Sequence, residues 1–231
     1  GVPVPAPARP DVTPTPVRPV RPAAALPWSA FAALVHRLGD GAGTAAPGGT
    51  LVVAVYGFSG AGKTWVAARL AAALGADLVH VDAYVPGWTG LPDGVRRLGR
   101  DLVGPWSRGL TGHAQLYDWD AGVPGDRLEL PPPPLAVLEG SGIASLAAGS
   151  GLAVRVWVHA APGVRADRLD AREDHLAYLP YRDTWARQEE ALARRQETLR
   201  RCDVRVLRAS TSGVHLAHPP APPAPTSLAD R

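Results

Sequence analysis

One short segment constrains this chain of 231 residues more than any other part of its sequence. The segment Gly57-Phe58-Ser59-Gly60-Ala61-Gly62-Lys63-Thr64 fits the pattern G-x-x-x-x-G-K-[ST]. Lys63 is the single lysine among 24 lysine and arginine residues, so a chain that otherwise uses arginine keeps a compact ammonium group here. The pattern is typical of a loop whose backbone N–H groups and lysine surround nucleotide phosphates.

The residues that flank this loop have the required order. The apolar, β-branched run 50–56 predicts a strand buried on both faces, and the Ala- and Leu-rich run 65–74 predicts a helix that ends at Gly75. A strand, a glycine loop and a helix N-terminus together form an anion site, whereas a glycine turn before a core helix is the alternative interpretation. The predicted nucleotide-binding residues are Gly57, Ser59, Gly60, Ala61, Gly62, Lys63 and Thr64.

Composition limits the classes of partner. The net charge is only +3, and no arginine cluster is interleaved with aromatic residues, so we expect no nucleic-acid binding. No apolar stretch approaches the length of a membrane span, so we expect no membrane insertion. The one cysteine, Cys202, excludes an internal disulfide and suits the reducing cytoplasm, which we predict as the location. The oligomeric state stays open.

Proline density divides the chain into three parts. Residues 1–27 consist almost entirely of Pro, Ala, Val and Arg, and the residues near the end repeat this composition. Proline at this density disfavours helix and sheet, so both segments are predicted to be disordered arms. We therefore predict an N-terminal arm over 1–27, a folded domain over 28–208 and a C-terminal tail over 209–231.

Predicted strands and helices alternate within the folded domain. After the first strand, further strands are expected over 77–82, 135–139, 153–159 and 203–207. Helices are expected over 29–38, 65–74, 95–103, 162–174 and 184–201. This order predicts an α/β, P-loop NTPase-type fold in three layers, with a mainly parallel five-stranded sheet and helices on both faces. Ligands of such sheets bind beyond the carboxyl ends of the strands.

Two predicted strands end in a carboxylate. Asp82 ends the strand after the loop helix, where a carboxylate could orient an acceptor hydroxyl and accept its proton. Glu139 ends the strand 135–139, where it could hold Mg²⁺ through water, and the Thr64 hydroxyl is expected to ligate the same ion. Turn or capping roles are the alternatives for both acids.

Arginines gather after residue 164. Arg168 and Arg172 lie four residues apart on a predicted helix and therefore share a face, and Arg182 follows in a loop. These three arginines could close as a small lid over a transferred phosphate and exclude water from it. Surface ion pairs with Asp167, Asp170 or Glu173 are the alternative.

Aromatic residues concentrate between the two carboxylates. Trp88, Tyr117 and Trp119 have flat faces that suit a base or sugar ring, and Asp118 or Asp120 could bind ring hydroxyls. Trp106 in the same stretch is expected to pack in the core.

In order, these segments resemble the uridine kinase-like group of P-loop kinases. The matching segments are Gly57–Thr64, 81–84 (VDAY), 86–91 (PGWTGL), 117–119 (YDW), 138–140 (LEG), 164–173 with 182–183, and 201–204 (RCDV). The resemblance implies ATP with Mg²⁺ as the phosphoryl donor and Lys63, Asp82, Arg168, Arg172 and Arg182 as catalytic residues. It also implies that a nucleoside-like acceptor binds at Asp82, Tyr84, Trp88, Tyr117, Asp118 and Trp119.

One departure from that group concerns the acceptor. Uridine kinases carry a pyrimidine-reading histidine five residues after the tyrosine of this motif, and Gly122 stands at that position here. The sequence therefore predicts an ATP-dependent kinase with a hydroxyl acceptor of open identity. A nucleoside monophosphate kinase, with Arg96, Arg97 and Arg100 as candidates for the acceptor phosphate, is one alternative. The other is an ATP-binding regulatory or scaffold protein that has no acceptor.

Overall fold

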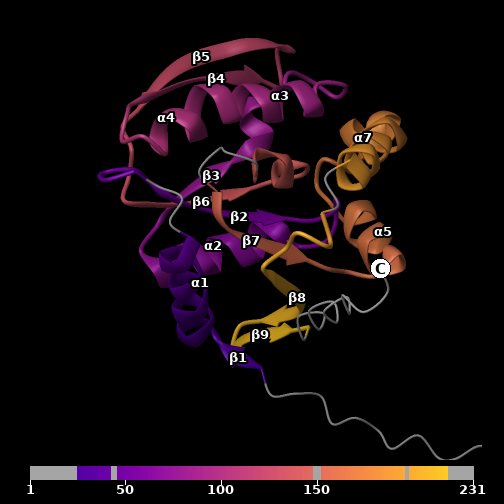
Figure 1. Ribbon diagram of the computed structural model, residues 1–231. Helices are drawn as coiled ribbons and strands as arrows, with labels where there is room; N and C mark the ends of the chain where they lie inside the picture. Colours follow the sequence, from indigo (N-terminus) through magenta and orange to yellow (C-terminus); the bar gives the residue numbers. More distant parts are fainter. Residues whose placement is uncertain (1–24, 43–45, 148–151, 196–197, 218–231) are drawn as a thin grey trace, which may run out of the picture.

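A seven-stranded sheet forms the centre of the molecule (Figure 1). The computed structural model describes residues 25–42, 46–147, 152–195 and 198–217. The strand order is β1-β9-β8-β7-β2-β6-β3. The strands are β1 (Leu26–Pro27), β2 (Leu51–Tyr56), β3 (Asp77–His80), β6 (Leu135–Glu139), β7 (Leu152–Val158), β8 (Val204–Ser210) and β9 (Gly213–Leu216).

Five of these strands run parallel, and two extend the sheet in the antiparallel sense. The parallel pairs are β3 with β6, β6 with β2, β2 with β7, and β7 with β8. Strand β9 pairs antiparallel with β8, and β1 pairs antiparallel with β9. The sheet is therefore mainly parallel, as predicted, although it has seven strands in place of the expected five.

The central strand β2 shows why the fold has three layers. Successive side chains of a strand point to opposite faces, and all side chains from Val52 to Tyr56 are buried. Val52, Ala54 and Tyr56 belong to one core cluster, whereas Val53 and Val55 belong to a second cluster on the other face. Helices α1 (Trp28–Ala42) and α2 (Lys63–Leu74) cover the second cluster.

The first cluster lies under a longer helical segment and a hairpin. Helix α3 (Leu91–Leu98) continues as a π-helical segment, η2 (Gly99–Val103), and ends in α4 (Gly104–Trp106). Strands β4 (Gly112–Asp118) and β5 (Val123–Leu130) form a separate antiparallel hairpin, which lies beside α3 in Figure 1. The remaining helices are α5 (Pro162–Asp170), α6 (His175–Tyr178) and α7 (Arg182–Arg195).

The hairpin is the largest element that the sequence analysis missed. Strand β5 contains Pro124 and Gly125, which disfavour strands, and the pairing register shifts between Gln115 and Tyr117. The hairpin forms because Asp118 accepts backbone hydrogen bonds across the turn and Gly122 adopts a positive φ of 68°.

The predicted domain limits of 28 and 208 are too narrow. Strand β1 lies in the segment predicted as an N-terminal arm, and β9 lies in the predicted C-terminal tail. Pattern analysis misses both because β1 has only two residues and β9 is a short edge strand whose pairing depends on the rest of the sheet. The remaining parts of the predicted arms, 1–24 and 218–231, lie outside the described residues.

Two predicted elements that carry predicted site residues end earlier than expected. The strand expected over 77–82 ends at His80, and Val81–Tyr84 forms a 3₁₀ turn, η1, that carries Asp82. The helix expected over 162–174 ends at Asp170, so Arg172 lies beyond it. No helix in the described ranges is both long and apolar enough to cross a membrane.

Candidate functional site

The glycine loop connects β2 to α2 at the carboxyl end of the central strand. Gly60 and Gly62 adopt φ values of +77° and +93°, which L side chains rarely adopt. A Cβ atom on Gly60 would also lie 2.5 Å from the backbone oxygen of Arg165 in α5. The loop therefore needs glycine at these positions for its shape and for the close approach of α5.

Lys63 occupies the first position of α2 and is 9% exposed. Its Nζ donates a hydrogen bond to the Phe58 carbonyl across the loop, at 3.3 Å. Among the described residues this is the single hydrogen bond of the ammonium group, which can donate three. The remaining donor capacity, the loop N–H groups and the helix N-terminus suit an anion such as a nucleotide phosphate.

Thr64 and Glu139 meet beside the loop. The Thr64 hydroxyl donates to Glu139 Oε1 at 3.2 Å, and His80 Nδ1 lies 2.7 Å from the same oxygen. Glu139 is 5% exposed because it ends the buried strand β6, which pairs with β2. A hydroxyl and a carboxylate are oxygen donors of the kind that Mg²⁺ prefers, so these two residues fit a magnesium ion.

Asp82 follows β3 at the same edge of the sheet. Solvent reaches its side chain, yet surrounding protein atoms desolvate the carboxylate and raise its pKa above the ordinary aspartate value. The positive charge of Lys63 lowers this pKa, and the negative charges of Glu139 and Glu189 raise it. Asp82 is thus electrostatically coupled to the loop lysine.

A further carboxylate, Glu189 of α7, binds the loop directly. Its Oε1 accepts hydrogen bonds from the Ser59 N–H at 2.9 Å, from the Ser59 hydroxyl at 2.7 Å and from the Ser141 hydroxyl. Glu189 is 4% exposed. The Ser59 N–H, which we predicted for nucleotide binding, is therefore directed toward α7.

The sequence contained a signal for Glu189 that our prediction did not use. Trp185, Glu189 and Leu192 recur at the spacing of one helix face, and all three are buried. A carboxylate at an apolar-face position needs a buried partner, because an unpaired buried charge is costly. The partner, Ser59, is 130 residues away in the chain.

Two arginines of α5 contact the loop. Arg168 Nη1 donates to the carbonyl oxygens of Gly60 and Ala61, each at 3.1 Å. Arg165 donates to the Ser59 carbonyl at 3.4 Å and lies over the Phe58 ring, while its buried Nε has no hydrogen-bond partner among the described residues. Arg165 was not among the predicted site residues.

The other two predicted lid arginines form ion pairs on the surface. Arg172 makes two hydrogen bonds to Asp174, at 2.7 and 2.6 Å, and Arg182 makes one to Asp170 at 2.6 Å. Arg172 and Arg168 do not share a helix face, because α5 ends between them. The charge of Arg172 nevertheless acts on Asp82.

The predicted acceptor aromatics belong to one cluster. Trp88 stacks on Tyr181 with ring centroids 4.9 Å apart. It also makes T-shaped contacts with Trp119 and Trp185, whose ring centroids lie 4.8 and 6.0 Å from its own. One face of Trp88 is therefore covered by Tyr181. Trp106 is buried and donates its Nε1–H to the Leu130 carbonyl at 2.9 Å, as expected for a core residue.

The hairpin brings Trp119, and Tyr117 packed on it, to the turn that carries Asp82. Trp119 Nε1 donates to the Asp82 carbonyl at 3.0 Å, and Tyr117 packs against Trp119 at 5.3 Å. Tyr84 lies in the same turn as Asp82. The Asp118 carboxylate instead accepts backbone hydrogen bonds within the hairpin turn, so it stabilises the turn.

A large cavity with a volume of about 900 Å³ opens beside the glycine loop. Its lining combines the start of α2, the ends of β7 and β8, and α5. The lining includes Gly62, Trp65, His159, Val164, Arg168 and Arg208. A cavity of this size beside a phosphate-binding loop is large enough for the nucleoside part of a nucleotide.

The sequence matches no family model and no curated protein. The resemblance to the uridine kinase-like group therefore remains a prediction. Two solved structures are similar to the fold. The first is a possible uridine kinase from Bacillus stearothermophilus, with 17% sequence identity, a TM-score of 0.48, and coverage of 76% of this chain and 98% of that one.

The second is a proposed fructose transport system kinase from Silicibacter sp. TM1040. It has 20% sequence identity and a TM-score of 0.48, and the match covers 70% of this chain and 94% of that one. Similarity at this level does not establish a shared activity, so the function has to be argued from the site itself.

Proposed function

We propose that this protein is a kinase that transfers the γ-phosphoryl group of ATP to a hydroxyl group of a small acceptor. One observation carries the proposal. A desolvated carboxylate, Asp82, is coupled electrostatically to the lysine of a glycine loop, Lys63, at the carboxyl edge of a mainly parallel sheet. A carboxylate at the sheet edge that carries the phosphate-binding loop could accept the proton of an acceptor hydroxyl, a role that a site holding only a nucleotide would not need.

The glycine loop and the large cavity next to it would bind ATP, the phosphoryl donor. Lys63 and the loop N–H groups would hold the phosphates, and the cavity that includes Trp65 and Arg168 would hold the nucleoside part of ATP. Thr64 and Glu139 would hold magnesium, which neutralises negative charge on phosphate oxygens when it is bound.

Asp82 would act on the acceptor, as the base that takes the proton of its hydroxyl group. The acceptor hydroxyl oxygen forms a bond to the γ-phosphorus as the bond from that phosphorus to the ADP oxygen breaks. The hydroxyl proton passes to the Asp82 carboxylate. A raised pKa makes this carboxylate a stronger base than an ordinary aspartate, provided that it is ionised at the working pH.

Positioning residues complete the site. Arg168 donates hydrogen bonds to the loop carbonyls of Gly60 and Ala61, Arg172 follows the end of α5, and Arg182 begins α7. In the kinase these arginines form a small lid that stabilises the charge of the transferred group. Tyr84, Trp88, Tyr117 and Trp119 form the wall against which a nucleoside-like acceptor lies, and Asp118 supports this wall by holding the hairpin turn.

A screen of acceptors tests the proposal. The purified protein is incubated with radiolabelled ATP, Mg²⁺ and a panel of nucleosides, sugars and nucleoside monophosphates, and labelled products are separated from ATP. We expect at least one labelled acceptor, and we expect Lys63→Ala to abolish the labelling.

Two results would contradict the proposal. Full phosphotransfer by Lys63→Ala would show that the loop is not the donor site. Slow release of inorganic phosphate with no labelled acceptor in the panel would instead favour the ATP-binding regulatory protein.

A further inference from the structure

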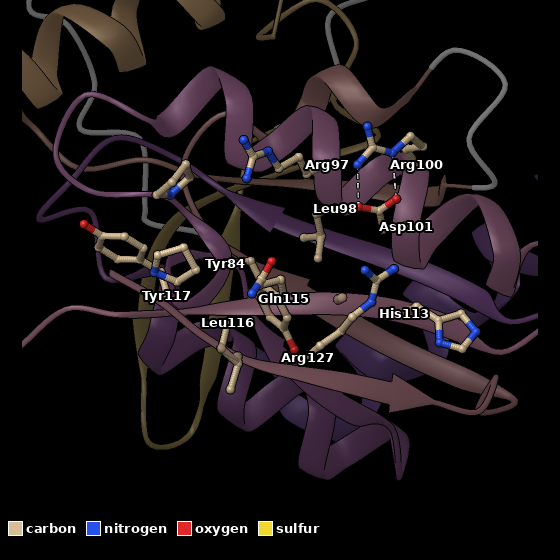
Figure 2. Close-up of a pocket in the computed structure, with 13 residues that line it drawn as sticks. Tyr84, Arg97, Leu98, Arg100, Asp101, His113, Gln115, Leu116, Tyr117 and Arg127 are labelled. Carbon is tan, nitrogen blue, oxygen red and sulfur yellow. Dashed lines mark hydrogen bonds and ion pairs between the residues drawn. The ribbon is translucent and has the colours of Figure 1, made fainter. Parts of the chain in front are cut away.

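A second cavity lies between the helical segment α3–η2 and the β4–β5 hairpin (Figure 2). Its volume is about 180 Å³. Arg97 and Arg100 line it from the helical side, Gln115 and Arg127 line it from the hairpin, and Tyr84 and Tyr117 close one end. None of the residues that bind the glycine loop takes part.

Positive charge exceeds negative charge in this cavity. The lining contains the guanidinium groups of Arg97, Arg100 and Arg127 against one carboxylate, that of Asp101. Asp101 is paired with Arg100 through two hydrogen bonds of 2.6 and 2.7 Å, which Figure 2 shows as dashed lines. The other two arginines are therefore not neutralised by any acidic residue of the lining.

The surroundings do not remove this excess. Arg97 binds Asp93 outside the cavity at 2.7 Å, and Asp93 is shared with Arg96 at 2.8 Å, so one carboxylate serves two arginines. Within the described residues the Arg127 side chain donates no hydrogen bond, and Figure 2 shows its guanidinium pointing from the hairpin toward Asp101.

The charges of all three arginines act on the Asp101 carboxyl group in the cavity. The pKa of the Asp101 carboxyl lies below the ordinary value, first because of the hydrogen bond from Arg100 and also because of the charges of Arg127 and Arg97. An anion that entered the cavity would meet the same charges. Hydrogen-bond donors on Tyr84, Tyr117 and Gln115 border the same space.

Size and geometry select the class of ligand. Cavities that enclose a whole drug-sized ligand usually measure about 300–1,000 Å³, so this cavity suits one group of a ligand and not a complete nucleoside. Planar guanidinium groups bind phosphate oxygens through paired hydrogen bonds, which makes phosphate the anion that several arginines recognise best.

We propose that this cavity binds a phosphate group of a small organic ligand, with Arg97, Arg100 and Arg127 as its cationic contacts. The cavity borders the proposed acceptor site, because Tyr84 shares a turn with Asp82 and Tyr117 packs on the Trp119 that binds Asp82. The role of the ligand rests on the proposed kinase function: it is a phosphorylated acceptor or a separate effector.

Calorimetric titration tests the binding site. The glycine loop is first saturated with Mg²⁺ and a non-hydrolysable ATP analogue, so that added phosphates cannot bind there. Inorganic phosphate and a panel of nucleoside and sugar monophosphates are then titrated into the full chain. We expect at least one probe to bind, and we expect Arg127→Ala and Arg97→Ala each to weaken that binding at least tenfold.

Arg108→Ala is the matched control, since Arg108 is an exposed arginine that follows α4 and does not line the cavity. It should leave probe binding within about twofold of the unmodified protein. Arg127→Lys, which keeps the charge without the planar fork, should give an intermediate loss. Binding of the ATP analogue verifies that each variant is folded.

Absence of binding by every probe, or an equal loss in Arg108→Ala, would overturn the proposal. Incubation of the bound probe with ATP then identifies its role. A doubly phosphorylated product marks the probe as the acceptor, and a changed rate without such a product marks it as an effector. Phosphate binding in a protein that phosphorylates nothing would contradict the kinase proposal and leave the cavity assignment intact.

Discussion

The Asp82 side chain lies where an ionised carboxylate, which the proposed reaction needs, is costly for the stability of the fold. Desolvation and the negative charges of Glu139 and Glu189 raise the cost of ionising the Asp82 carboxyl. The positive charge of Lys63 offsets part of this cost. The sequence predicted Lys63 and Asp82 at the same edge of the sheet, and the charge of Lys63 lowers the pKa of Asp82. The desolvation of Asp82 could not be read from the sequence, because it depends on the protein atoms that surround the carboxylate.

The raised pKa of Asp82 predicts a dependence of stability on pH. The folded protein binds more protons than the unfolded chain between the ordinary aspartate pKa, about 3.9, and the raised value. Stability therefore falls as pH rises through this window. Asp82→Asn removes the effect, so its thermal midpoint should exceed that of the unmodified protein at pH 7 and approach it near pH 3, while phosphotransfer is lost.

Thermal unfolding followed by circular dichroism at several pH values measures this difference. Asp77→Asn, at an exposed position at the start of β3, serves as the control and should leave both stability and phosphotransfer unchanged. A lower midpoint for Asp82→Asn at pH 7 would mean that the carboxylate stabilises the fold.

At the scale of the element, α7 connects the two halves of the site. Glu189 binds the glycine loop through Ser59, and the adjacent Gln188 accepts from the Leu91 N–H at 3.2 Å and donates to the Trp88 carbonyl at 2.8 Å. One turn of helix thus contacts both the proposed donor loop and the proposed acceptor wall. The sequence predicted a helix over 184–201, whereas these contacts depend on the tertiary structure.

Substitution of Glu189 should disturb the glycine loop through the lost contacts with Ser59. Glu189→Gln removes the charge that accepts hydrogen bonds from Ser59 and Ser141, and we expect a loss of about 1–3 kcal/mol in the free energy of unfolding. Affinity for ATP should fall roughly tenfold, equivalent to about 1.4 kcal/mol, because the loop is less well held.

Chemical denaturation and ATP titration measure the two effects of this substitution. Glu190→Gln is the matched control, since Glu190 is the next residue of α7 and is exposed. Equal effects of the two substitutions would show that Glu189 has no specific role at the loop.

At the scale of the whole molecule, the two ends of the described chain complete the sheet. Leu26 of β1 pairs with Val214 of β9, and the Trp28 side chain donates to the Ser210 carbonyl at 2.9 Å. Val214 is fully buried. The folded unit therefore extends from β1 to β9, beyond the limits that proline density predicted.

Truncation tests this extent. Removal of residues 211–231 deletes β9 and exposes the edge of β8, and the lost burial of Val214 alone costs about 1.5–3 kcal/mol. Removal of residues 218–231 keeps β9 and should leave the unfolding midpoint within a few degrees of that of the full chain. Equal stability of the two truncated proteins would show that β9 is dispensable.

The sequence by itself determined the glycine loop, the mainly parallel sense of the sheet and the position of Glu139 at the end of a strand. These features follow from local patterns of glycine, apolar and β-branched residues, whose conformational preferences act over a few residues. The tertiary structure alone decided the Glu189 contact with the loop, the β4–β5 hairpin and the arginine-lined cavity. Each of these joins residues far apart in the chain, and their pairing depends on how the helices and strands pack together.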